Sequence, residues 1–175
     1  MIRPRFIVVS AVAVLLTFLA HEGAHWAAGE LLGNRMDMNL NAAYPESGQF
    51  LKASHKGVVD AAGPLLTLLQ AVLALLVVLK AGSLLAYPFI LSALVMRLLA
   101  TGVSVFNPND EARLSLAMGL GTWTLPFLVC GVLVALTIIA SRRLRATWSF
   151  NTISVVLIIL FSSAVILSSQ FVAGR

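Results

Sequence analysis

Two histidines and a glutamate lie within five residues of one another near the N-terminus. The segment reads His21-Glu22-Gly23-Ala24-His25 and matches the pattern His-Glu-x-x-His. On a helix, residues four apart share one face, so both imidazoles can reach one metal ion with Glu22 beside it. Zinc suits two imidazoles and a carboxylate, and it keeps a fourth position for water in catalytic sites. The spacing therefore predicts a zinc centre with His21 and His25 as ligands and Glu22 as the general base.

The apolar surroundings of this motif favour metal binding over an ordinary buried helix face. Hydrophobic residues make up 59% of the chain and charged residues only 11%, whereas roughly a quarter of the residues of a soluble domain are charged. Ionisable side chains inside an apolar helix are costly unless they are paired or ligated. The third histidine of the longer metzincin motif is absent, because Leu31 stands at its position.

Five apolar segments are long enough to cross a membrane as helices, for which about 20 residues are needed. The net charge of +5 comes from basic residues at the ends of these segments, where they face lipid headgroups rather than nucleic acid. We therefore expect one all-α membrane domain over residues 1–175, with the lipid bilayer as its surroundings. The expected spans are residues 6–32, 58–79, 84–106, 122–140 and 150–171.

Two polar stretches separate these spans. Residues 33–56 contain alternating apolar residues at Met36, Met38 and Leu40, a pattern compatible with a short hairpin and equally with an irregular loop. After the third span, the run 107–109 reads Asn-Pro-Asn, which predicts a turn and the N-cap of a short helix.

A third metal ligand has to come from another segment. At about 1.5 Å per residue, His21 and His25 lie near the far end of the first span. The second span returns and the third crosses again, so Asp110 reaches the same side, where it is also suited to a helix N-terminus. Glu46 lies on that side too and is the second candidate. Glu111 could replace Asp110, although we expect it to be a solvated carboxylate in the first turn of the helix.

These residues resemble the site-2 protease family of intramembrane zinc metalloproteases. The matches are the segment 21–25, the run Ala-Gly-Pro-Leu at 62–65, and Phe106-Asn107 followed by Asp110. They cover roughly residues 6–140, and residues 150–171 form an additional span. The resemblance implies that the chain hydrolyses peptide bonds in or near transmembrane segments of other proteins, and that Asp110 completes the zinc ligands.

The chain departs from the family pattern at two places. The family's aspartate usually follows a longer proline-rich loop and precedes glycine, whereas here Asp110 follows Asn-Pro-Asn and precedes Glu111. Thr67 stands where the family often has asparagine, three residues after the proline. The departures support an alternative, a non-catalytic relative that binds transmembrane segments, but a pure binder does not need Glu22. A metal transporter would need further ionisable groups across the bilayer, and the last two spans supply none.

Three further expectations concern the surroundings of the site. Arg97 lies in the middle of the third span and is expected to pair with Glu30 or Asp60, because buried charges are usually paired; the alternative is a charge partner near the active site. The strand-like residues 36–40 are expected to pair with an extended substrate. With the N-terminus in the cytoplasm, six basic residues flank the inner side and five, including Arg175, the outer side, so this orientation is favoured by a small margin.

Overall fold

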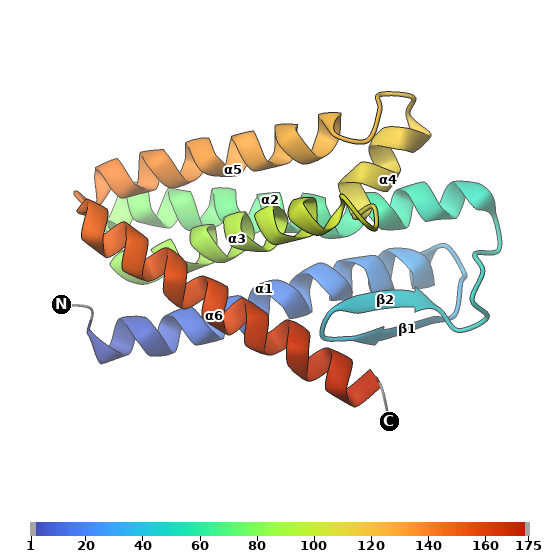
Figure 1. The fold of residues 1–175 in the computed structure, drawn as a ribbon, viewed down its shortest axis with the longest axis horizontal. Coiled ribbons are helices and arrows are strands. Elements are labelled where there is room, and N and C mark those ends of the chain that lie inside the picture. The colour runs from blue at the N-terminus through green and yellow to red at the C-terminus, as the bar shows by residue number, and fades with distance from the viewer. Residues whose placement is uncertain (1–2, 174–175) are drawn as a thin grey trace.

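Long runs of apolar residues form the helices of an all-α membrane protein in the computed structural model, which describes residues 3–173 (Figure 1). Five helical segments are long and apolar enough to cross a membrane, as predicted. In chain order the elements are α1 (Pro4–Leu31), β1 (Met36–Asn39), β2 (Ala42–Pro45), α2 (Ala53–Ala81), the 3-10 turn η1 (Leu84–Ala86), α3 (Tyr87–Val103), α4 (Asp110–Ala117), α5 (Thr124–Arg143) and α6 (Trp148–Ala173). Arg175, counted above on the outer side, lies outside the described residues.

Helix α3 is the centre of the bundle. It packs against α1, α2, α5 and α6, and ten of its eleven residues from Tyr87 to Arg97 are buried. Such all-round burial leaves no polar face on α3. The one charged residue in this stretch, Arg97, is therefore enclosed by protein and must find its partners there.

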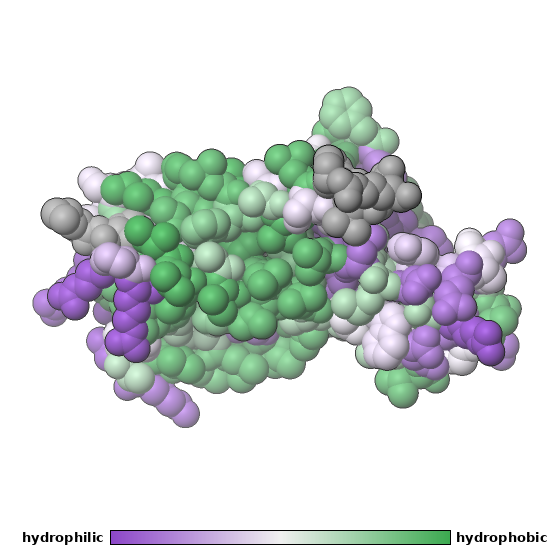
Figure 2. All heavy atoms as spheres, turned by 90° about the horizontal axis from the view of Figure 1, so that it is seen from below, coloured by the Kyte–Doolittle hydropathy of each residue, from purple (hydrophilic) through white to green (hydrophobic). Residues whose placement is uncertain are grey.

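The outer surface has the layered polarity of a membrane protein. Figure 2 shows apolar side chains in a band across the middle of the molecule and polar side chains at both ends of its long axis. The end that carries the start of α1, the end of α2 and the α5–α6 connection (Figure 1) has basic residues only, which are Arg3, Arg5, Lys80, Arg142, Arg143 and Arg145. All seven acidic residues of the chain lie in segments toward the other end.

The polar stretch after α1 forms a two-stranded antiparallel hairpin. Met36 lies opposite Pro45 and Asn39 opposite Ala42, so the hairpin turns at residues 40–41. A turn follows at residues 45–48, where Gly48 donates its backbone N–H to the carbonyl of Pro45. Met36 is buried against Gly29 of α1, where a Cβ would meet the methionine side chain. This contact fixes the hairpin beside the second half of α1.

The short helix predicted after the third span is α4. Asn109 is its N-cap, and its Oδ1 accepts the backbone N–H of Ala112 at 2.9 Å. α3 ends at Val103, three residues earlier than expected, and the Ser104 hydroxyl accepts the backbone N–H of Asn109. The connection is therefore hydrogen-bonded to both helices, and it orients the first turn of α4 so that Asp110 reaches His21 of α1.

Candidate metal centre

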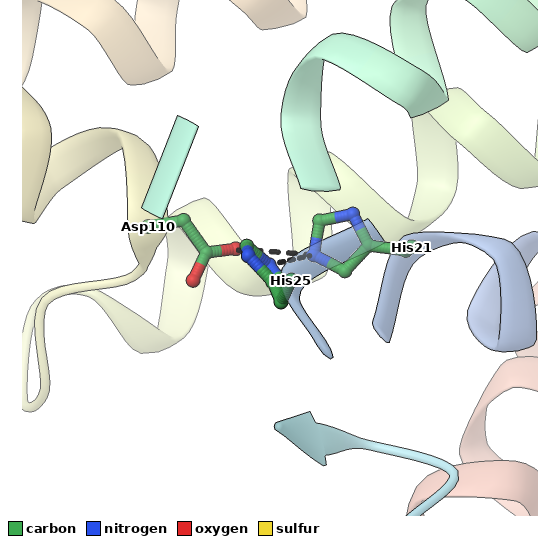
Figure 3. A group of neighbouring side chains, drawn as sticks. All are labelled: His21, His25 and Asp110. Carbon is green, nitrogen blue, oxygen red and sulfur yellow. Dashed lines mark hydrogen bonds and ion pairs between the residues drawn. The ribbon is translucent and has the colours of Figure 1, made fainter. Parts of the chain in front are cut away.

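Helices α1 and α4 bring the three predicted ligands to one point. His21 Nε2 lies 3.1 Å from His25 Nε2, and Asp110 Oδ2 lies 3.1 Å from His21 Nε2 and 3.4 Å from His25 Nε2. Figure 3 shows the Asp110 carboxylate extending toward both imidazoles. The two histidines are buried, and Asp110 is partly buried. Among the described residues this is the group of His, Cys, Asp and Glu side chains that could hold a metal ion.

Hydrogen bonds fix the tautomer of His21. Its Nδ1 lies 3.0 Å from Thr67 Oγ1, and the Thr67 hydroxyl donates its own proton to the carbonyl of Gly63. The hydroxyl oxygen must therefore accept from His21, so the imidazole proton is on Nδ1. The lone pair of Nε2 is left for a metal, as in metal sites where a hydrogen bond orients each histidine. Thr67, which stood out as a departure from the family pattern, has this positioning contact.

His25 is oriented in the same way by a backbone group. Its Nδ1 lies 2.5 Å from the carbonyl oxygen of Val59 in α2. A carbonyl can only accept, so Nδ1 carries the proton and Nε2 faces His21 and Asp110. The ring of His25 is therefore held from α2, the helix that also carries the Gly-Pro motif.

Gly63 allows α1 and α2 to approach at the two histidines. A Cβ at this position would lie 2.5 Å from His21 Cε1 and 2.7 Å from His21 Nδ1, and closer still to His25 Nε2. Both rings are held by hydrogen bonds to α2 itself. They have little freedom to move away from an added methyl group, so glycine is required here for packing rather than for backbone conformation.

The donor set fits zinc in distance and in charge. Tetrahedral zinc with Zn–N and Zn–O bonds near 2.0–2.1 Å separates its ligand atoms by about 3.3 Å, close to the three separations found here. Electron pairs that face one another at this distance repel unless a proton or a metal ion lies between them. In and around the donor set lie four carboxylates (Glu22, Asp60, Asp110 and Glu111) and three cations (Lys56, Arg97 and Arg113). With all these side chains ionised, their net charge is 3 − 4 = −1.

Two arginines, Arg97 and Arg113, donate to the Asp110 carboxylate. Arg113 Nη2 donates to Asp110 Oδ1 at 2.6 Å and to Asp60 Oδ1 at 2.8 Å. Burial alone would raise the pKa of Asp110, but hydrogen bonds with His21 and His25 and the charge of Arg97 outweigh burial and keep this pKa well below its usual range. Asp110 is therefore ionised and presents Oδ2 to the histidines while Oδ1 is engaged by Arg113.

Glu22 lies beside the donor set without joining it. The residue is only 6% exposed, and its carboxylate has no hydrogen-bond or ion-pair partner within hydrogen-bonding distance among the described side chains. It lines a cavity of about 560 Å³ together with residues from α1, β2, α2, α3, the α3–α4 segment and α6. A buried carboxylate that faces a cavity without a fixed partner can accept a proton from a molecule bound in that cavity.

The predictions for two charged residues near Asp110 were wrong. Arg97 pairs with neither Glu30 nor Asp60, because its Nη1 donates to Glu111 at 3.1 Å and to Asp110 at 3.2 Å. Glu111 is correspondingly buried, with 3% exposure, and is not a solvated carboxylate. Adjacent residues in the first turn of α4 thus point to different partners, Asp110 to the histidines and Glu111 to α3.

The other predicted or neighbouring acidic residues lie apart from the donor set. Glu46 is exposed in the turn after β2, and its backbone N–H bonds the carbonyl of Arg35. Asp60 is buried and pairs with Lys56 and Arg113. The contact of Arg113 with Asp110 was not predicted from the sequence. The spacing could have indicated it, because Arg113 lies three residues after Asp110, on the same side of α4.

Compared with known families, curated proteins and solved structures, the chain matches none of them.

Proposed function

We propose that the chain is an intramembrane zinc endopeptidase that hydrolyses peptide bonds in or near transmembrane segments of other proteins. The observation that carries the proposal is the convergence of His21, His25 and Asp110 with both Nε2 lone pairs directed inward. Glu22, with no fixed partner, lies beside them in the same cavity. A site that served only to hold the helices together would have no use for an unpaired buried carboxylate.

Each residue has a separate role in this chemistry. Zinc, when bound by His21, His25 and Asp110, would supply a Lewis acid that polarises a carbonyl group and activates a water molecule. Glu22 takes the proton of the attacking water and returns it to the leaving amine. Thr67 and the Val59 carbonyl keep the two imidazoles in the tautomer that presents Nε2.

The location of ionisable groups favours hydrolysis over transport. The acidic cluster lies toward one end of the bundle, and α6 has no charged residue within its described range. α5 has charged residues only in its last turn. A transporter would need ionisable groups along a path through the bilayer, and within their described residues these two helices have none before the last turn of α5.

Strand β2, which pairs with the strand-like residues expected to bind substrate, also offers a strand edge to the cavity. Strands in an antiparallel pair alternate between bonded and non-bonded residue pairs, and Glu46 bonds Arg35. The backbone groups of Met36 and Ala43 therefore point away from the partner strand. At Met36 they are taken by Glu30 and by Trp26 of α1. The backbone groups of Met38, opposite Ala43, also point outward, but Met38 does not line the cavity, whereas Ala43 of β2 does. The outward N–H and carbonyl of Ala43 are therefore placed to pair with an extended chain in the cavity.

Removing this backbone donor is expected to weaken cleavage without affecting the metal. Ala43→Pro deletes the outward N–H, and the loss of one hydrogen bond to substrate, worth about 1 kcal/mol, should lower kcat/KM roughly fivefold. Ala43→Val has a side chain of similar size but keeps the N–H, and it should cleave like the wild type. Equal kcat/KM for the proline and valine variants would remove β2 from substrate binding.

The function is tested by incubating the detergent-purified protein with synthetic transmembrane peptides. Each peptide has an apolar segment of about 20 residues, with or without a central Gly or Asn-Pro that lets the helix unwind. Mass spectrometry should detect internal cleavage of the interrupted peptides, loss of cleavage with a zinc chelator, and recovery with zinc but not magnesium. Two results would contradict the proposal. One is cleavage that persists in the presence of the chelator. The other is a zinc-loaded protein that cleaves none of the peptides, which would favour a non-catalytic binder.

We also propose that the N-terminus is cytoplasmic. The end with six basic and no acidic residues among its described segments is suited to the cytoplasmic leaflet. In a Cys130→Ala background, a cysteine at Ala146 should then be labelled from the cytoplasmic side and one at Ser47 from the opposite side. The reverse pattern would invert the orientation.

A further inference from the structure

Arg97 makes a contact that a metal ion would break. Its guanidinium is 3% exposed in the middle of α3. Nη1 donates to both oxygens of Glu111 and to Asp110 Oδ2, and Nη2 donates to His21 Nε2 at 3.2 Å. Nε has no partner among the described residues. One of the two terminal nitrogens is thus held by carboxylates, while the other is held by the imidazole.

His21 Nε2 cannot serve Arg97 and a metal at the same time. A neutral imidazole has one lone pair in its plane, and His21 keeps its proton on Nδ1 because of Thr67. A metal bound at Nε2 would therefore occupy the lone pair that accepts the hydrogen bond from Arg97 Nη2. The contact of Nη1 with Asp110 can persist, because a carboxylate oxygen has a second lone pair.

Glu111 keeps the displaced guanidinium at the site. Both Glu111 and Arg97 are 3% exposed, and separating such a buried pair would leave two uncompensated charges. Arg97 also lines the cavity that contains Glu22 and the histidines. Once its nitrogen is released from His21, the arginine has unpaired N–H donors beside the metal ligands and facing the place where a substrate would bind.

We infer that Arg97 is a catalytic residue that donates to the carbonyl oxygen of the peptide bond under attack; this rests on the proposed function. As the water oxygen bonds to the carbonyl carbon, Glu22 takes the water proton and the carbonyl electron pair moves onto the carbonyl oxygen. Nη2 of Arg97 stabilises the negative charge there, as preorganised donors do in other hydrolases. The C–N bond then breaks, and the amine leaves with the proton from Glu22.

A purely structural Arg97 would behave differently. In that case the guanidinium only neutralises Asp110 and Glu111, and its removal would weaken metal binding but leave anion binding at the metal unchanged. Arg113 is the matched comparison, because it also donates to Asp110 but contacts Oδ1 and Asp60 rather than His21. Comparing variants of the two arginines therefore distinguishes two roles, the support of the Asp110 carboxylate and the donation of a hydrogen bond to a bound anion.

The test is azide binding to the cobalt(II)-loaded full-length protein, followed by the visible absorption of the metal. Loss of one charge-assisted hydrogen bond, about 1.5–3 kcal/mol, predicts that Arg97→Gln raises the azide Kd roughly 10- to 100-fold. Arg113→Gln should raise this Kd by less than about threefold, because Arg113 does not contact His21 and its partly exposed charge is screened. Arg97→Lys, which keeps a cation and one donor, should give an intermediate Kd, and it replaces Arg97→Gln if the latter does not fold.

The outcomes separate the inference from the proposed function. If Arg97→Gln and Arg97→Lys hold one cobalt per chain and bind azide as tightly as Arg113→Gln, Arg97 is structural and the inference is overturned while the metal site stands. If the folded wild type holds neither cobalt nor zinc, the proposed function itself is overturned.

Discussion

Replacing Glu22 by glutamine is expected to abolish peptide cleavage while the metal stays in place. Glutamine has the shape of glutamate but cannot take a proton from water, and the loss of a positioned general base costs about 10²- to 10⁴-fold in rate. Because Glu22 lies outside the donor set and has no hydrogen-bond partner among the described residues, the change should not disturb His21, His25 or Asp110. The measurement is kcat on a cleaved transmembrane peptide together with zinc per chain.

The matched control for this prediction is Glu46→Gln. Glu46 is exposed in the turn after β2, so its neutralisation removes the same charge at a distance from the donor set. This variant should retain both zinc and cleavage. A Glu22→Gln protein that cleaves within threefold of the wild type would exclude Glu22 as the base, and one that loses its zinc would instead make Glu22 a ligand.

The second large effect is expected from a single methyl group on α2. Gly63→Ala places a Cβ against both imidazoles, so the rings must turn and lose their hydrogen bonds to Thr67 and Val59. Loss of such orienting contacts typically weakens metal binding about 10- to 100-fold each. We therefore expect zinc affinity to fall by at least about 100-fold, as measured by competition with a chelator of known affinity.

Gly57 supplies the comparison for this change. It lies in the same helix, and a Cβ there would meet nothing within 4 Å. Both substitutions gain the same helix propensity, about 1 kcal/mol in favour of alanine, so any difference in zinc binding reports the contact with the histidines. Wild-type zinc affinity in Gly63→Ala would mean that the imidazoles are not held where α2 meets α1.

The membrane architecture could be predicted because it depends on the length and composition of single segments. Spans of about 20 apolar residues are readable without knowing their neighbours, and counting them placed Asp110 on the side of His21 and His25. The N-cap at Asn109 was equally local, since one side chain satisfies the first turn of its own helix. The ligand roles of the three residues remain predictions.

The partners of the buried charges could not be predicted in this way. That Arg97 needed a counter-ion followed from its position in a span, but the choice of Glu111 over Glu30 or Asp60 depends on how α4 is rotated against α3. The same holds for Thr67, which touches His21 only because Gly63 lets two helices approach. Such contacts depend on how the helices pack against one another, and the sequence periodicity within one helix does not predict them.

Zinc per chain in the detergent-purified protein is the most direct test of the central claim. Elemental analysis should find about one zinc in the wild type, the stoichiometry of a single three-ligand catalytic site. The same amount should be present in Glu22→Gln and Glu46→Ala, and nearly none in His21→Ala and Asp110→Ala. Zinc that is lost in Glu46→Ala but kept in Asp110→Ala would reassign the third ligand. A folded wild-type protein without zinc, even after zinc is supplied, would contradict the protease and leave a non-catalytic binder of transmembrane segments.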